Sequence, residues 1–490
     1  MKKTSGRGLI KLTLASMAVV AVASAPLFGS ATGLSHSPFA IKATNIEKPG
    51  IYAIKPFLKG GPGEGSGTNP GTGSGSEPGS GPGESTSPTT PPATASPTPS
   101  TPSDPDPDLI SITLDTRKCN YGTIGFQVAS SISLPDSSDP SAITTVTEKL
   151  PVDGTVSWGD GSTSKLAYGS MNHTYKSYGE YTMELRGTVG GLTTSSASNC
   201  YTRINHMGDE TGIRSLEGFL SSAKYITEVA EPPVTLQVAR SMFSGSTSFN
   251  GDTSQWTLPN LVDAGGMFQG ASNFNGDLGK LDTRKLLRAG SMFRTAYAFE
   301  GRGLESWDTS NLRQMGSMFA STRVFTGKIG DWDVSKVTSF DSTFTESNFN
   351  EPLNGWNPES ATTVASMFKK NKNFNQPIDN WNLSKVQNFS YMFSDALKFN
   401  QPVNGWKVDS GVNFERMFYR DGGSSSTVMA FNQPLDRWDT GNATNMLGMF
   451  WGTTAMAQDL SMWNVAKVTS KDVFASGTKM TSAQLPRWNK

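Results

Sequence analysis

Few side chains in this 490-residue sequence are placed for catalysis or metal binding. Its three histidines, His36, His173 and His206, match no common spacing of metal ligands. No nucleophile elbow, zinc-protease helix or phosphate-binding loop is present. Asp331 and Asp333 would share one face of a strand, but a solvated outer face shows the same pattern. We therefore expect a protein that is not an enzyme and that needs no cofactor or metal ion.

The remaining candidates for chemistry lie between residues 108 and 203. Cys119 and Cys200 are the only cysteines, and in an exported protein such a pair predicts a disulfide; two buried free thiols are the alternative. A loop of about 80 residues would stabilise the fold by roughly 4 kcal/mol in the chain-entropy model. Asp160 lies between Gly159 and Gly161, where a carboxylate either forms the turn or binds Ca²⁺, and we favour the turn.

The bulk composition limits the partners of this chain. Its 42 basic and 42 acidic residues give no net charge, so we expect no nucleic-acid partner. Charged residues make up only 17% while Gly and Pro are abundant, which is typical of a turn-rich extracellular protein with a low-complexity segment.

The N-terminal segment 1–31 reads as a secretory signal peptide. A basic start precedes an apolar run over residues 12–28. Two triplets with small residues, one ending at Ala23 and one at Ala31, are candidate cleavage sites. An uncleaved membrane anchor is the alternative, since 17 apolar residues lie at the short limit for spanning. We predict a secreted or cell-surface protein that contacts a membrane only through this segment, if it is not cleaved.

Two segments without a core follow. Residues 32–58 are too short to fold alone. Residues 59–107 are nearly all Gly, Pro, Ser, Thr and acidic residues, with too few apolar side chains to offset the entropy of ordering. We predict a disordered linker or stalk.

A repeated motif organises the rest of the chain. The stretch Phe374–Phe393 is written again, with small changes, upstream and downstream. Successive copies are 24 to 26 residues apart, except for one step of 32 that reflects an insertion around residues 421–426. A period held this long predicts about ten stacked coils rather than one globular core. The closing aromatic residues are Phe243, Phe268, Phe293, Phe319, Phe344, Phe368, Phe393, Phe418, Phe450 and Phe474.

Two periodicities within each unit suggest its local structure. Residues around Trp381 read as a short strand. Val386, Phe389 and Phe393 then follow at helical spacing, with Ser384 placed as an N-cap. We therefore predict a mainly β protein with short helices, in which a β/α solenoid over residues 237–482 follows a connector or N-terminal cap at 204–236 and precedes a tail at 483–490.

The recurring residues are expected to be structural and the variable ones to face a ligand. We predict a buried ladder of indole rings within the stack, with an exposed sugar-stacking ladder as the alternative. The tryptophans are Trp307, Trp332, Trp356, Trp381, Trp406, Trp438 and Trp463. An asparagine ladder inside the solenoid is expected from Asn275, Asn350, Asn375, Asn400 and Asn432. Binding is expected at the variable positions Arg313, Lys369, Lys372 and Arg437.

Residues 108–203 show short alternating runs separated by turns, the pattern of a small β-sandwich. The sequence Val156 to Ser162, with its Trp-Gly-Asp-Gly turn, and the later His173-Thr174-Tyr175 and Gly179-Glu180-Tyr181 resemble a PKD-type immunoglobulin-like domain. Trp158 would fill the sandwich core.

The repeats are similar to those of the BspA-type leucine-rich-repeat surface proteins, which share a Phe-Asn…Trp-Asp-x-Ser…Met-Phe motif. Trp307-Asp308-Thr309-Ser310 and Trp332-Asp333-Val334-Ser335 carry it clearly, whereas the first two units depart from it. This resemblance implies a leucine-rich-repeat-like fold and an exported adhesin that binds a protein on host or neighbouring cells. A glycan-binding module and a self-associating structural protein are the alternatives.

Overall fold

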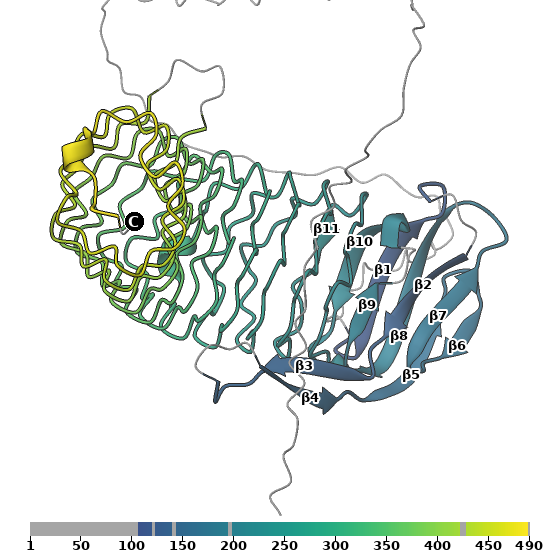
Figure 1. The fold of residues 1–490 in the computed structure, drawn as a ribbon. Helices are drawn as coiled ribbons and strands as arrows, with labels where there is room; N and C mark the ends of the chain where they lie inside the picture. Colours follow the sequence, from purple (N-terminus) through teal and green to yellow (C-terminus); the bar gives the residue numbers. More distant parts are fainter. Residues whose placement is uncertain (1–105, 120–122, 140–143, 195–197, 422–427, 489–490) are drawn as a thin grey trace, which may run out of the picture. The chain divides into compact units, whose positions relative to one another are not determined.

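The computed structural model describes residues 106–488, without 120–122, 140–143, 195–197 and 422–427. The predicted signal segment 1–31, residues 32–58 and the linker up to residue 105 lie outside this range. All described residues belong to one compact unit, Thr94–Lys490. A region of β-sheet is followed along the chain by a stack of similar coils (Figure 1).

The first region is built mainly of antiparallel strands. A six-stranded sheet has the order β11-β10-β1-β8-β5-β6, a three-stranded sheet the order β7-β2-β9, and β3 pairs with β4. The only parallel pair among these strands in the described chain joins β10 to β11. The strands are β1 Leu109–Asp115, β2 Thr123–Val128, β3 Ser131–Pro135, β4 Thr145–Lys149, β5 Val152–Ser157, β6 Thr163–Lys165, β7 Gly169–Thr174, β8 Glu180–Val189, β9 Leu192–Thr194, β10 Tyr201–Met207 and β11 Glu228–Val229.

The core of this region forms from alternate residues of the strands. Ile110, Ile112 and Leu114 of β1 are fully buried, as expected when every second side chain of a strand points to one face. Trp158 is 1% exposed, and its ring lies 5.9 Å from that of Phe126 on β2. The predictions of an all-β region and of a buried Trp158 are therefore confirmed.

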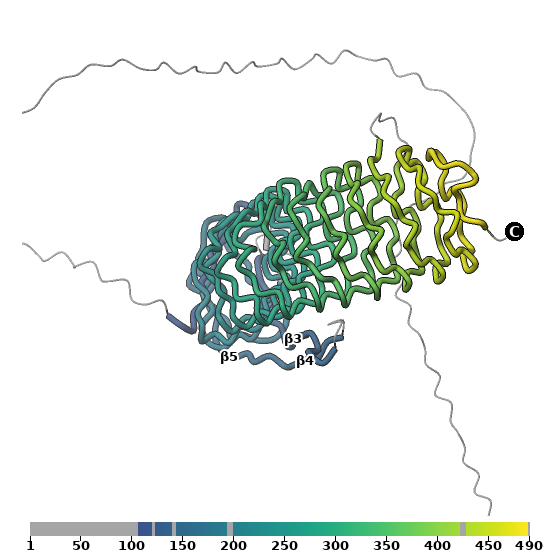
Figure 2. Tube along the Cα trace, turned by 90° about the vertical axis from the view of Figure 1, so that its left-hand side faces the viewer, coloured from purple at the N-terminus to yellow at the C-terminus, as the bar shows by residue number. Residues whose placement is uncertain are grey.

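The coils continue from the sheet region through one parallel backbone bridge per coil. The first bridge joins Gly191, just before β9, to Ser215, so the stack begins inside the predicted connector. Figure 2 shows the coils side by side. The ladder runs through Gly191, Ser215, Val238, Asp263, Arg288, Gln314, Ser339, Thr363, Asn388, Asn413, Asn445 and Ser470.

The predicted β/α solenoid with short helices is wrong, although a mainly β protein is correct. In the described chain the only helical segments are four 3-10 turns of three residues each, at Ser198–Cys200, Asp209–Thr211, Leu304–Ser306 and Ser482–Gln484. The expected helix after Ser384 is absent, and Ser384 is not an N-cap. Its N–H and hydroxyl instead donate to Oδ1 of Asn382, at 3.3 and 2.8 Å, in a turn.

Hydrogen bonds between coils replace those of the expected helix. The N–H groups of Phe389 and Tyr391 donate to carbonyls of the next coil, whereas the N–H of Met392 donates to the carbonyl of Phe389. An α-helix would direct every one of these donors to the residue four positions earlier. The alternation bends the chain at Tyr391, whose φ is +59°. Each coil is thus a closed path of turns whose remaining donors bind its neighbour.

Contacts beside the ladder join the sheet region to the first coils. Glu148 of β4 forms an ion pair with Arg214 at 2.7 Å, and Nη2 of Arg288 donates to the carbonyl of Thr144 at 2.8 Å. Ile132 of β3 packs with Val238 of the ladder in a small apolar cluster. The β3–β4 hairpin therefore braces the array as well as the sheets.

Candidate functional site

Ser162, His173 and Asp160 meet beside the turn between β5 and β6, but not in the order that nucleophilic catalysis requires. The Ser162 hydroxyl donates to Oδ1 of Asp160 at 2.6 Å, and Nε2 of His173 lies 2.7 Å from Oδ2 of the same carboxylate. In a catalytic triad the imidazole lies between serine and carboxylate. Here Ser162 and Asp160 both approach the same imidazole nitrogen, since the Ser162 hydroxyl lies 3.5 Å from Nε2. The carboxylate contacts both other side chains. It therefore serves as an anchor for the turn.

The electrostatics and backbone of this turn agree with that structural role. The hydrogen bond from Ser162, followed by that from His173, lowers the pKa of Asp160 to about 2. Gly159 and Gly161 have φ of +83° and +88°, which side-chain-bearing residues adopt only with strain. A Cβ at Gly159 would also lie 2.4 Å from the carbonyl oxygen of Thr182. The predicted turn over these three residues is thus present.

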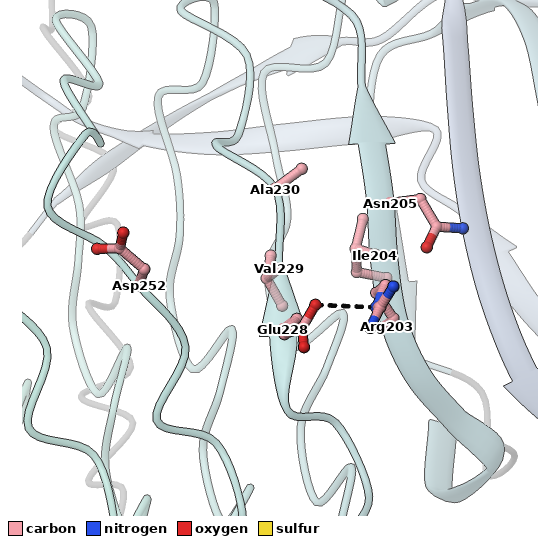
Figure 3. Close-up of a pocket in the computed structure, with 7 residues that line it drawn as sticks. All are labelled: Arg203, Ile204, Asn205, Glu228, Val229, Ala230 and Asp252. Atoms are coloured by element: carbon pink, nitrogen blue, oxygen red, sulfur yellow. Dashed lines mark ion pairs between the residues drawn. The ribbon is translucent and has the colours of Figure 1, made fainter.

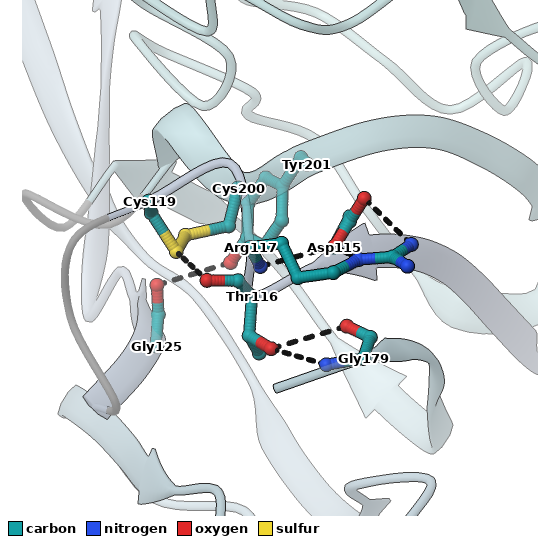
Figure 4. The surroundings of a disulfide bond; sticks show 8 residues. All are labelled: Asp115, Thr116, Arg117, Cys119, Gly125, Gly179, Cys200 and Tyr201. Carbon is teal, nitrogen blue, oxygen red and sulfur yellow. Dashed lines mark hydrogen bonds and ion pairs between the residues drawn. A yellow bond between two sulfur atoms is a disulfide. The ribbon is translucent and has the colours of Figure 1, made fainter. Parts of the chain in front are cut away.

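The predicted disulfide between Cys119 and Cys200 is present and lies in a structural setting (Figure 4). Beside it, the Thr116 hydroxyl donates to the carbonyl of Gly179 and accepts from its N–H, at 3.1 and 2.8 Å. The buried hydroxyl of Tyr201 donates to the carbonyl of Gly125 at 3.0 Å. The bridge therefore ties two loop ends of the sheet region together.

A polar groove of about 440 Å³ lies where β10 and β11 meet the first coils (Figure 3). The ion pair between Arg203 and Glu228, at 2.9 Å, spans part of it. Both side chains are more than half exposed, so neither has the desolvated setting that shifts a catalytic group. The other lining residues are Ile204, Asn205, Val229, Ala230 and Asp252.

No cluster of three or more His, Cys, Asp or Glu is arranged to hold a metal ion in the residues that the structure describes. Within the same residues, no helix has the length and apolar character to cross a membrane.

The recurring tryptophans are buried within the stack, as predicted. Each of the seven is at most 5% exposed, and its indole N–H donates to a backbone carbonyl of the preceding coil. Trp381, for example, donates to Leu353 at 3.1 Å and stacks on Trp356 at 6.1 Å. Sugar stacking on these rings would require them to leave the core. The closing residues Phe319, Phe344, Phe368, Phe393, Phe418 and Phe450 are fully buried.

The asparagine ladder exists, but it lies toward the surface rather than inside. Oδ1 of Asn375 accepts the N–H of Asn400 at 2.9 Å, and Asn400 does the same for Asn432. Asn350 and Asn275 accept in the same way from the coils that follow them. These side chains are exposed or half-buried.

The predicted binding residues Arg313, Lys369, Lys372 and Arg437 occupy different positions around the coil. Arg313 precedes the ladder residue Gln314, and its Nη1 donates to the carbonyl of Asp139 near the β3–β4 hairpin. Lys369 lies six residues after the ladder position Thr363, with its ammonium 4.7 Å from the ring centre of Tyr391. Lys372 and Arg437 are exposed elsewhere on the coil. The structure does not bring these four residues together.

A column that sequence reasoning missed directly follows the buried closing Phe, and its side chains are at least partly exposed except at Ala320 and Ser394. In nine successive coils the N–H of the column residue donates to the carbonyl of the residue three positions earlier, so the backbone conformation is the same in each coil. The side chains of this column differ widely in size and charge. Reading the sequence in columns at the repeat period would have found it. The residues are Ser244, Gln269, Arg294, Ala320, Thr345, Lys369, Ser394, Tyr419 and Trp451.

Comparison with known proteins gives one match. The repeats match the family model described as "Mycoplasma protein of unknown function, DUF285" at residues 234–329, 291–395, 324–428 and 424–488, which together span more than half of the chain. No curated protein and no solved structure matches.

Proposed function

The chain belongs to the DUF285 family of Mycoplasma proteins through its repeats at residues 234–488, and from this premise we propose that it is an exported binding protein. Its array recognises a protein on the surface of host or neighbouring cells. It carries out no chemistry of its own.

The column after the closing Phe is the observation that carries this proposal. A fixed backbone position bears Gln269 in one coil, Lys369 in another and Trp451 near the end. The backbone hydrogen bonding of the array does not depend on which side chain stands there, because the same bond forms each time. Repeat proteins use such surfaces for recognition, since the scaffold tolerates changes at outward positions.

Export is supported by the predicted signal segment 1–31 and by the disulfide between Cys119 and Cys200, a bond that persists in oxidising environments. The linker at 59–107 would hold the folded region away from the cell envelope. We further propose that residues 108–203 form a PKD-like domain and that the chain is a surface adhesin, as its resemblance to BspA-type proteins implies.

The test is binding of the purified full-length chain, without its predicted signal segment, to two immobilised panels. One panel holds purified extracellular-matrix and cell-surface proteins, and the other holds glycans. We expect saturable binding to at least one protein of the first panel. Binding to glycans alone would replace the proposal with a carbohydrate-binding role. Light scattering that shows polymerisation, without binding to either panel, would replace it with a structural role.

A further inference from the structure

Two columns of the array have a left-handed backbone, one of which includes Glu346, Lys370 and Asp395; in the other, most coils carry a small residue. Small residues suit this conformation because a large Cβ substituent is strained at positive φ. This second column holds Gly218, Ser241, Gly266, Ser291, Ser317, Ser342, Ser366 and Gly448.

Tyr391 and Arg416 break this rule in two successive coils. Their φ values are +59° and +49°, as at the Ser and Gly positions of the same column. Val473, in the last coil, is a third exception, at +52°. Because Ser and Gly fit the position with less strain, the architecture of the coil does not call for a large side chain there. Strained residues of this kind cluster at functional sites.

The side chains of Tyr391 and Arg416 lie at the centre of a surface cluster. The Tyr391 hydroxyl donates to Oε1 of Glu415 at 2.7 Å and accepts from Nη1 of Arg416 at 2.6 Å. The ammonium of Lys369 lies over the ring of Tyr391, 4.7 Å from the ring centre. The Arg416 guanidinium is 5.7 Å from the centre of that ring and 5.6 Å from that of Tyr419. The cluster is therefore rigid before any partner arrives.

An exposed indole extends this cluster along the stack. The ring of Trp451 lies 5.2 Å from that of Tyr419, and Trp451 is 36% exposed. The tryptophans of the repeat motif, by contrast, are at most 5% exposed. We call the six residues the Tyr391 patch: Lys369, Tyr391, Glu415, Arg416, Tyr419 and Trp451.

We propose that the Tyr391 patch is the contact site for an acidic segment of a partner protein. This inference rests on the proposed function and names the site where it is carried out. Tyr, Trp and Arg are the residues that dominate the binding energy of protein interfaces. A rigid, preorganised set of such side chains loses little entropy when a partner docks.

The charges of the patch and the limited access to its ring faces favour an acidic protein segment over a sugar. Within the patch, Lys369 and Arg416 are cations and Glu415 is a carboxylate that already pairs with Arg416 at 3.2 Å. Asp421 lies at the edge of the patch, 3.5 Å from the Tyr419 hydroxyl. Among the described residues, no carboxylate forms an ion pair with Lys369, whose ammonium lies over the ring of Tyr391. A carboxylate of a partner would form this missing ion pair. A sugar would need an open ring face, whereas cations already lie over Tyr391 and beside Tyr419.

The test compares the full-length chain with the double variant Tyr391→Gly, Arg416→Gly. Glycine already occupies this column at Gly266 and Gly448, so we expect a melting temperature within about 2 °C of the unchanged protein. Ser317→Gly, in the same column but outside the patch, is the matched control. The probes are a synthetic peptide array, in which peptides differ only in their number of Asp and Glu residues, and the two immobilised panels described above.

The expected result is preferential binding of the acidic peptides, weakened about 30-fold or more in the double variant and unchanged in Ser317→Gly. Loss of this binding on addition of salt would support the ionic part of the contact. If the unchanged chain binds a panel protein and the double variant binds it equally well, the patch is overturned and the proposed function stands. If the double variant loses only glycan binding, the patch binds a glycan and the proposal of an acidic protein partner is wrong. If the chain binds no protein or peptide at all, the proposed function fails together with this inference.

Discussion

Replacing a motif tryptophan by alanine should divide the array, and Trp381→Ala is the best case. Trp381 is 3% exposed and packs between Trp356 and Phe368, with ring centres 6.1 and 6.3 Å away. Removing a buried indole costs about 3–5 kcal/mol. The carbonyl of Leu353 loses its indole donor as well, which costs about a further 1–3 kcal/mol. We expect a total destabilisation of about 4–6 kcal/mol, since the two effects overlap.

The effect should be local because each coil contacts mainly its neighbours. Loss of one interior contact in such an array weakens the coupling between the coils on either side. We therefore expect two unfolding steps in urea where the unchanged protein has one, measured by circular dichroism and by tryptophan fluorescence.

Trp451→Ala is the matched control, because it removes the same side chain from an exposed position of the same array. It should cost less than about 1 kcal/mol, in line with surface substitutions. The reasoning would be refuted if Trp381→Ala unfolded at the same urea concentration as the unchanged protein. Equal destabilisation by the two variants would also refute it, since burial would then not determine the cost.

Three further predictions concern the sheet region and the coil edge. Reduction of the bridge, or Cys119→Ser with Cys200→Ser, should lower stability by about 2–5 kcal/mol, as measured by thermal unfolding with and without reductant. The pKa of Asp160, about 2, lies below the ordinary value of 3.8, so its contribution to stability is complete above pH 3.8 and is lost as the pH falls toward 2. Asp160→Asn should remove this part of the acid sensitivity, and urea midpoints that keep the same pH dependence would argue against it. Asn375→Ala removes the acceptor for the N–H of Asn400 and should cost about 1–3 kcal/mol; Asn375→Asp, which keeps an acceptor, should cost less.

The interior of the array could be predicted from the sequence because apolar side chains recur at one position in every copy. Trp381 and Phe393 are buried whatever local backbone carries them, so the period alone identified them. The disulfide was also predictable, since only two cysteines exist.

The local backbone of the coils could not be predicted in the same way. Phe389 and Phe393 are spaced as on a helix, and successive turns of the coil bury side chains at much the same interval. The difference lies in the left-handed φ at Tyr391, which glycine would have signalled and tyrosine does not. The Tyr391 patch was missed for a related reason. Its members come from four successive coils, and only columns aligned across the stack bring Lys369 and Trp451 together.

The single bridge per coil has a mechanical consequence. Phe368 and Phe393, one coil apart, have ring centres separated by 5.6 Å. A coil pulled out of the stack by tension would release about 25 residues, or about 80–90 Å of extended chain. Length would thus be gained in large steps, each limited by the hydrogen bonds between two neighbouring coils. An array attached to a surface at one end and bound to a partner at the other would therefore lengthen under tension before the contact with the partner broke.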